Sequence, residues 1–310
     1  MDFYKLKPRV VEKIWGGNKL NTWRNLENEN LIGETLEVSR LKGNSSFTLD
    51  GKFLSDLIPD DELPFLIKYI DTTDNLSVQV HPDDDYAMKK ENSLGKTECW
   101  LILSADKGAG IYLGLKDSVT KEKLKTEIKS NGPVHELLNF YPVSKGDFFF
   151  VPAGTIHAIG KGITLVEVQQ SCGITYRVWD WNRVDSNGKS RELHVENALD
   201  VIEFSREMNS KEFFRFKENV FSDKAVDLAS HKDFIATIYN LDELSNCEHH
   251  LKKNHSRFTA LTVLEGAITI EVNDKKVDLL EKNSLILKPN SQAKVLLTSK
   301  ADKCSVLVVD

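Results

Sequence analysis

The stretch Leu76-Ser-Val-Gln-Val-His81 alternates apolar and polar residues along its whole length. A period of two is typical of a β-strand, so the three apolar side chains should share one face. Gln79 and His81 should then point together from the opposite face. The segment Pro82-Asp-Asp-Asp85 follows at once, and its proline and acidic residues are typical of the start of a helix.

Short strands recur through the chain and predict a mainly β fold. The clearest of the others are Phe65–Ile70, Glu98–Leu103, Gly146–Pro152, Ile163–Val168 and Thr175–Trp179. Amphipathic helices are predicted at Ser118–Asn131, which Gly132-Pro133 should end, and at Glu192–Phe204. From Phe213 to Asp310, short strands return at a spacing of roughly 8–12 residues, which is typical of a sandwich or barrel.

An internal repeat is a further interpretation. The segment Lys145–Pro152 is similar to Lys282–Pro289, at an offset of 137 residues. The same offset carries His157 onto Lys294, so a second barrel would copy the first without its histidine. A chance match is the alternative, because a strand followed by proline is a common pattern.

Composition limits the class of protein. The chain has 310 residues, of which 40% are hydrophobic and 28% charged, as expected of a soluble globular protein with one large domain or a few smaller ones. The net charge of -6 argues against a nucleic-acid partner. No apolar stretch is long enough for a membrane span or a signal peptide. Four scattered cysteines without a CxxC pair favour a reduced, cytoplasmic protein.

Potential metal ligands lie on three of the predicted strands. Gln79 and His81 share one strand face, Glu98 begins the next strand, and His157 follows a turn that leads into a third. Two imidazoles and a carboxylate are standard zinc ligands, and the interior of a β-barrel can gather them at one point. Because an isolated histidine on a strand is more often structural, spacing alone leaves this site one of two interpretations.

A denser group of histidines occurs near the C-terminus. His249, His250 and His255 lie among Lys252, Lys253 and Asn254. We interpret these histidines as exposed, and we expect no metal at them or near Lys294.

Several motifs carry a resemblance to a known family. The chain resembles type I mannose-6-phosphate isomerases, in their short bacterial form, over most of residues 8–200; the last hundred residues match only loosely. The motifs are Leu76–Asp84, Gly95–Trp100, Val151–His157, Thr175–Arg183, and the opening pair Ile14–Gly17 and Ile32–Glu34.

This resemblance implies a fold and a division into domains. The implied architecture has two cupin, or jelly-roll, β-barrels with an inserted helical region. The catalytic cupin domain would cover residues 1–205, with its helical insertion at about 82–140. Residues 206–310 would form a cupin-like barrel without metal. The implied protein acts on a small phosphosugar, with neither nucleic acid nor membrane as partner, as a monomer or weak homodimer.

The resemblance also implies roles for individual residues. One zinc ion per chain would be bound by His81, Glu98 and His157, with Gln79 a less certain ligand. Arg177 and Lys96 would be catalytic. The implied substrate-binding residues are Ser77, Glu34 and Trp15.

The implied reaction interconverts mannose 6-phosphate and fructose 6-phosphate through an enediol. It needs a base near C1 and C2 and positive charge near the oxygens. Glu34, Lys96, a zinc-bound water and a histidine all remain candidates for the base. Arg177 is expected to share a strand face with Thr175 and Trp179 and to point toward substrate.

Other interpretations remain open at this stage. Arg177 could instead form an ion pair with Asp180 or Asp185. The chain could isomerise a different phosphosugar, bind sugar without catalysis, or be a metal-dependent dioxygenase.

Overall fold

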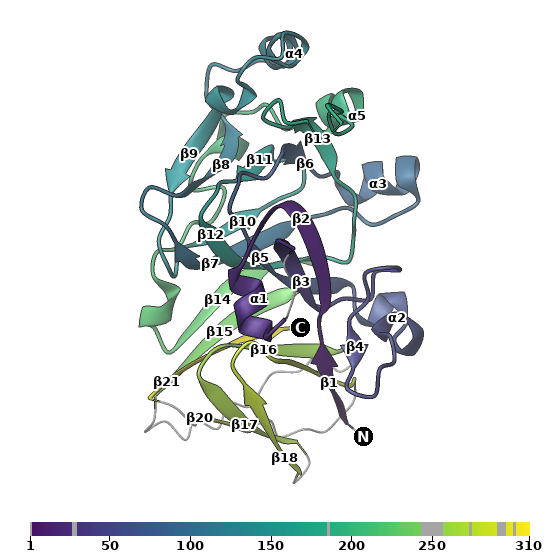
Figure 1. Cartoon of the computed structure of the whole chain (residues 1–310), viewed down its shortest axis with the longest axis vertical. Helices are drawn as coiled ribbons and strands as arrows, with labels where there is room; N and C mark the ends of the chain where they lie inside the picture. The colour runs from purple at the N-terminus through teal and green to yellow at the C-terminus, as the bar shows by residue number, and fades with distance from the viewer. Residues whose placement is uncertain are drawn as a thin grey trace. The chain divides into compact units, whose positions relative to one another are not determined.

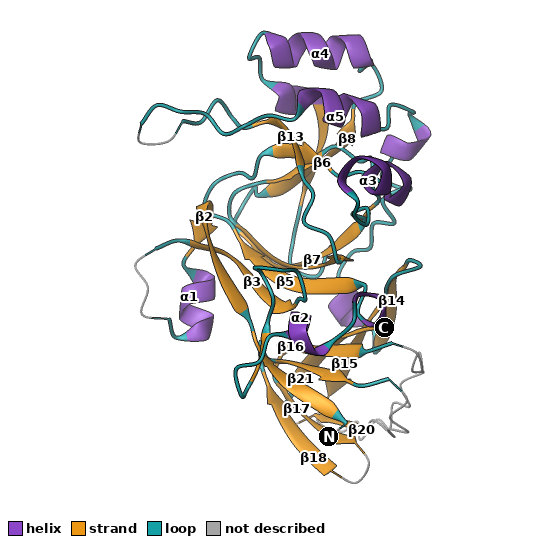
Figure 2. Cartoon of the chain, turned by 90° about the vertical axis from the view of Figure 1, so that its right-hand side faces the viewer, coloured by secondary structure: helices purple, strands orange, loops and turns teal. Residues whose placement is uncertain are grey.

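The computed structural model describes residues 2–26, 30–184, 187–242, 257–272, 275–289, 296–299 and 302–310, and it is mainly β (Figures 1 and 2). Its strands pair antiparallel in every pairing with a described register, as in the hairpin of β17 and β18. The predicted mainly β fold class is confirmed. Within the described residues, no helix combines the length and the apolar character needed to cross a membrane.

The chain packs into two compact units, each assembled from separate stretches of sequence. One unit comprises residues 1–11, 35–69 and 219–310, and the other comprises residues 12–34 and 70–218. The division falls within three strands: β2 (Arg9–Gly17), β3 (Ile32–Val38) and β5 (Phe65–Asp71). The assignment of a catalytic domain to 1–205 and of a second barrel to 206–310 stays a prediction.

The unit that contains the C-terminus is built from two sheets. The larger sheet has, in order, β14 (Ala225–Ser230), β15 (Ile235–Asp242), β21 (Lys303–Val309), β16 (Thr259–Glu265), β19 (Ser284–Leu287), β1 (Phe3–Lys7) and β4 (Phe47–Thr48). The smaller one has β18 (Lys275–Leu280), β17 (Ala267–Val272) and β20 (Leu296–Ser299). Ile268, Ile270 and Val272 alternate along β17 and enter the core of this unit. The predicted C-terminal strands are therefore present.

The repeat is described only in part. Its strand segment lies at β19, as predicted. Lys294, His249, His250 and His255 lie outside the described residues, so the expected absence of metal there stays a prediction.

The second unit contains the residues of the predicted metal site. Its five-stranded sheet has, in order, β13 (Tyr176–Trp179), β6 (Val78–Val80), β11 (His157–Ile159), β8 (Gly110–Leu115) and β9 (Leu138–Pro142). Three further strands lie side by side, in the order β10 (Phe148–Val151), β7 (Glu98–Ala105) and β12 (Ile163–Gln170). Trp100 of β7 meets His157 of β11 edge-on, with ring centroids 5.2 Å apart. The two groups of strands thus face each other across a shared interior.

Helices lie beside the outer face of the five-stranded sheet (Figure 2). They are α3 (Asp84–Glu91), α4 (Lys121–Lys129) and α5 (Val195–Val201), with one 3₁₀ turn at Val134–Leu137. Thr120 caps α4, since its hydroxyl accepts a hydrogen bond from Lys123 N at 3.2 Å. The range 82–140, predicted as a helical insertion, holds α3 and α4 but also the strands β7 and β8.

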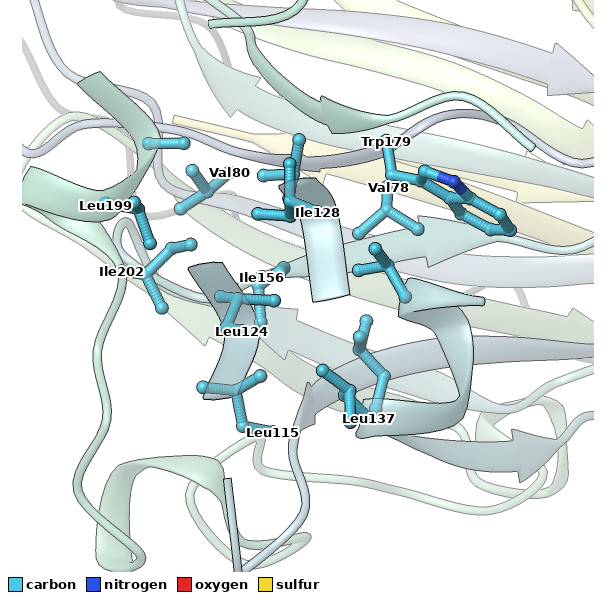
Figure 3. Packing of buried hydrophobic residues seen from close by; sticks show 14 of the residues in the cluster. Val78, Val80, Leu115, Leu124, Ile128, Leu137, Ile156, Trp179, Leu199 and Ile202 are labelled. Carbon is cyan, nitrogen blue, oxygen red and sulfur yellow. The ribbon is translucent and has the colours of Figure 1, made fainter. Parts of the chain in front are cut away.

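The apolar face of α4 packs against β6. Leu124 and Ile128 are buried in one cluster with Val78 and Val80 (Figure 3). Because successive side chains on a strand alternate, this packing turns Gln79 toward the interior of the unit. The strand is shorter than its sequence alternation predicts, and Leu76 packs instead in the interior cluster that contains Trp100.

Leu124→Ala should destabilise this helix layer. Leu124 has no exposed surface, and truncation of a fully buried leucine costs about 2–5 kcal/mol in free energy of unfolding. Urea denaturation measures the loss. Lys123→Ala, an exposed position on the same helix, serves as the control and should change stability by less than about 0.5 kcal/mol. Equal stability of both variants would contradict the packing described here.

Candidate metal centre

Three side chains from three strands converge in the interior of the second unit. His81 follows β6, Glu98 begins β7, and His157 begins β11. One donor atom from each lies within 4.8 Å of the others. Each residue is at most 2% exposed. The structure therefore brings together the three ligands that the sequence predicted for zinc.

Backbone carbonyls fix the orientation of both imidazoles. Nδ1 of His81 lies 2.8 Å from the carbonyl oxygen of Ile174, and Nδ1 of His157 lies 2.9 Å from that of Thr155. A carbonyl can only accept, so each Nδ1 carries a proton and donates it. In the neutral imidazole each Nε2 then carries the lone pair, and it faces Glu98, at 3.6 Å from His81 and 3.3 Å from His157. This arrangement is typical of histidines that bind metal.

Lys96 lies within the same group of donors. Its Nζ is 2.7 Å from Oε2 of Glu98 and 3.0 Å from Nε2 of His81. Despite that short distance, Oε2 of Glu98 accepts no hydrogen bond of acceptable angle from the described part of the chain. A buried carboxylate oxygen without a well-directed donor has lost its hydration and can gain from a cation.

Glu167 is a functional candidate that the sequence analysis missed. Its Oε1 lies 3.5 Å from Nζ of Lys96, and the residue is 2% exposed. In the register of β12 against β7, Glu167 opposes Trp100, so it faces the interior. Glu167 is the one charged residue in the strand Ile163–Gln170. A charge within an otherwise buried strand was the signal that could have found it.

The charges of this group favour a divalent cation. With Glu98 and Glu167 ionised, Lys96 supplies one positive charge against two negative ones. A buried charge without compensation is costly. Two imidazole nitrogens and a carboxylate, with no thiolate, form the donor set of catalytic zinc sites. The residues present thus fit a bound zinc ion.

Gln79 and Ser77 lie beside the centre. Nε2 of Gln79 is 3.3 Å from Nε2 of His157, and the hydroxyl of Ser77 donates to Oε1 of Gln79 at 3.3 Å. Rotation of the amide by half a turn would direct Oε1 toward the centre instead. Gln79 is therefore placed where a fourth, oxygen ligand could be supplied.

Arg177 shares a sheet face with these residues. Gln79 opposes His157 on one neighbouring strand and Arg177 on the other, so all three side chains leave the sheet on the same side. Nη1 of Arg177 donates to the carbonyl of Glu192 at 2.7 Å, and its buried Nε has no hydrogen-bond partner among the residues that the structure describes.

The prediction that Trp179 shares this face is wrong. The register of β13 shifts between Arg177 and Trp179, so that Trp179 opposes Val78. Trp179 is buried with Tyr176 and Val178 in the cluster in which α4 packs against β6. A β-bulge is the physical reason, because one extra residue moves the following side chain to the other face.

Asp180, considered as an ion-pair partner for Arg177, pairs instead with two other arginines. Asp180 accepts hydrogen bonds from Nη2 of Arg183 at 2.5 Å and from Nε of Arg191 at 2.6 Å. Burial raises the pKa of the Asp180 carboxyl, but the hydrogen bonds from Arg191 and Arg183 outweigh it and leave the pKa below its usual value. Within the described residues, Arg177 forms no ion pair with a carboxylate. Asp185 lies outside them.

Two predicted substrate-binding residues have other contacts. Trp15 is 5% exposed and packs in the interior cluster with Trp100. Glu34 forms an ion pair with Lys13, with Oε2 and Nζ 3.1 Å apart. Their roles in substrate binding stay predictions.

Comparison with known sequences identifies several relatives. The mannose-6-phosphate isomerase of Streptococcus mutans is 40% identical over 222 residues, which are 66% of this chain and 69% of that protein. The mannose-6-phosphate isomerase ManA of Bacillus subtilis is 42% identical over 212 residues, 64% of this chain and 67% of that one. A further B. subtilis relative, YvyI, is 33% identical over 303 residues and covers 91% and 92%. No family model matches the chain.

Solved structures are similar over the whole chain. The crystal structure of the mannose 6-phosphate isomerase from Bacillus subtilis aligns with a TM-score of 0.82 at 27% identity, and covers 100% of both chains. A mannose 6-phosphate isomerase solved with zinc bound aligns with a TM-score of 0.74 at 15% identity, and covers 100% of this chain and 99% of that one. At 15% identity the likeness shows the fold alone.

His157→Ala should abolish tight zinc binding and leave the unit folded. Loss of a residue that only orients a ligand weakens metal binding by about 10–100-fold, so loss of a ligand should cost at least as much. Zinc titration with a competing chelator measures the affinity. His231→Ala, in the other unit, is the matched control and should bind like the wild-type chain. Unchanged zinc affinity in His157→Ala would rule out this centre.

Proposed function

The chain belongs to the mannose-6-phosphate isomerase family, and we propose that it is a zinc-dependent enzyme that interconverts mannose 6-phosphate and fructose 6-phosphate. The convergence of His81, Glu98 and His157 beside Lys96 is the observation that carries this proposal. We further propose that this unit is a cupin-type barrel and that the second barrel binds no metal.

The proposed zinc ligands are His81, Glu98 and His157, with Oε1 of Gln79 as the fourth. When bound, zinc would supply a Lewis acid that polarises an oxygen of the sugar. The carbonyls of Ile174 and Thr155 hold the two imidazoles in the tautomer that this requires. The surroundings of the centre are buried, so electrostatic interactions within it are stronger than they would be in water.

Proton transfer is proposed for the pair Glu167 and Lys96. The reaction of the open-chain aldose removes a proton from C2 and returns one to C1, while the hydroxyl proton on O2 is lost and one is gained on O1. A carboxylate can take the C2 proton and give it back at C1, and we assign this role to Glu167. The ammonium of Lys96, 3.5 Å from it, would stabilise the negative charge that develops on the oxygens in the enediol stage.

Arg177 is proposed to bind the anionic substrate. Its guanidinium is free of carboxylate partners within the described part of the chain, and its buried Nε still has a hydrogen to donate. A phosphate or enediolate oxygen would satisfy that donor, and a guanidinium can bind such oxygens in a bidentate manner. Ser77, two residues before Gln79 on the same side, is proposed as a hydroxyl donor to the phosphate.

An assay on metal-analysed protein tests the proposed function. Mannose 6-phosphate, glucose 6-phosphate and unphosphorylated mannose are compared as substrates at equal concentration. Turnover of mannose 6-phosphate alone supports the proposal. Preferential turnover of glucose 6-phosphate would establish a different phosphosugar isomerase, and no turnover of any sugar by the zinc-loaded chain would favour a binding protein.

Arg177→Lys should lose most turnover and keep its zinc. Lysine retains the charge but lacks the planar fork of donors, and loss of one oriented donor to an oxyanion costs about 10²–10³ in kcat. Arg206→Lys is the matched control, because Arg206 is a largely exposed arginine paired with Asp117, and its kcat should match the wild type. Near-normal turnover of Arg177→Lys would make Arg177 a structural residue of the rim.

A further inference from the structure

The turn that follows β13, residues 180–183, is anchored through all of its side chains. Trp181 and Asn182 both have left-handed backbone conformations, with φ of 57° and 54°. This conformation is uncommon for a bulky residue and costs free energy, so the surrounding contacts must hold it. Nε1 of Trp181 donates to the carbonyl of Leu76 at 2.6 Å, and Nδ2 of Asn182 donates to that of Asn131 at 3.1 Å.

Asp180 is the residue that connects this turn to both sides of the candidate site. On one side it binds Arg183, whose Nη1 donates to the carbonyl of Asn75 at 2.7 Å, just before Ser77. On the other side it binds Arg191 through both carboxylate oxygens. The residue after Arg191 is Glu192, whose carbonyl accepts the hydrogen bond from Arg177.

A continuous chain of contacts therefore runs from Asp180 to Arg177. The carboxylate fixes the guanidinium of Arg191, the backbone carries that constraint to Glu192, and the carbonyl of Glu192 fixes Nη1 of Arg177. The side chain of Arg177 is only half-buried, so without this anchor it would sample several rotamers.

We propose that Asp180 is a positioning residue for phosphosugar binding, which holds Arg191 so that the guanidinium of Arg177 stays fixed and available to the anionic substrate. This rests on the proposed function of Arg177. Asp180 itself contacts no substrate in this scheme. Because it occupies both neighbouring arginines, it also reduces the repulsion between three guanidinium groups on a short segment.

The direction of the change in substrate affinity distinguishes a positioning role of Asp180 from a purely electrostatic one. Asp180→Asn removes a negative charge near the site, so a pure charge effect would strengthen the binding of an anionic phosphosugar. Loss of positioning has the opposite effect, since a displaced guanidinium binds more weakly. We expect KM for mannose 6-phosphate to rise about tenfold, because small displacements of a positioned group carry costs of this order or more.

The experiment compares Asp180→Asn with Asp74→Asn. Asp74 is a half-exposed carboxylate that pairs with Arg183, so its substitution removes the same charge from the same neighbourhood and leaves the contacts of Asp180 intact. The dissociation constant of a 6-phosphorylated hexitol, which has no carbonyl and cannot isomerise, is measured by calorimetry alongside KM. We expect weaker binding and full zinc content in Asp180→Asn, and binding equal to or tighter than wild type in Asp74→Asn.

Arg191→Lys provides a second test that keeps the charge and removes the planar fork. It should raise KM and the hexitol dissociation constant in the same direction, and it decides the matter if Asp180→Asn does not fold. Wild-type or tighter binding in a folded Asp180→Asn, or wild-type binding in Arg191→Lys, would overturn the proposal. Absence of mannose 6-phosphate turnover in the wild-type chain would instead overturn the proposed function, and this proposal with it.

Discussion

The alternation of β6 is the constraint on which the rest of the second unit depends. Val78 and Val80 are buried against α4, and Gln79 between them faces the metal centre. A slip of one residue would exchange these faces, placing an amide in the apolar layer and a valine at the metal centre. Burial on both sides therefore fixes the register, and the register sets Gln79 between His157 and Arg177.

The interior of this unit contains a buried group of charged side chains. Burying these charges costs free energy that an apolar interior would not cost. Glu98, Glu167 and Lys96 are all at most 5% exposed. Apolar residues of similar volume would often be at least as stable as such a buried ionic group. The proposed binding of a cation and an anionic substrate accounts for this group, and the surrounding apolar clusters supply the stability that it does not.

The sequence could predict those parts of the site that depend on residue type and local period. Strand periodicity and ligand chemistry made His81, Glu98 and His157 candidates, the family resemblance favoured them over a structural interpretation, and the structure brings them together. Glu167 was missed although its charge stands out in a buried strand, because its partner Lys96 lies 71 residues away in the sequence and no local pattern pairs the two. The position of Trp179 was predicted wrongly because a bulge depends on tertiary packing, and no local pattern marks the point where the register shifts.

Three side chains of the candidate site are oriented by carbonyl groups of the backbone. The carbonyls of Ile174, Thr155 and Glu192 accept from His81, His157 and Arg177, respectively. A backbone carbonyl accepts equally well whichever side chain its residue carries, so these contacts cannot be recognised from the types of the residues. They depend instead on the path of the backbone; for Glu192, the proposed anchor is the contact of Asp180 with Arg191. The geometry of the site is thus encoded partly in residues that contact neither the metal ligands nor, in the proposed scheme, the substrate.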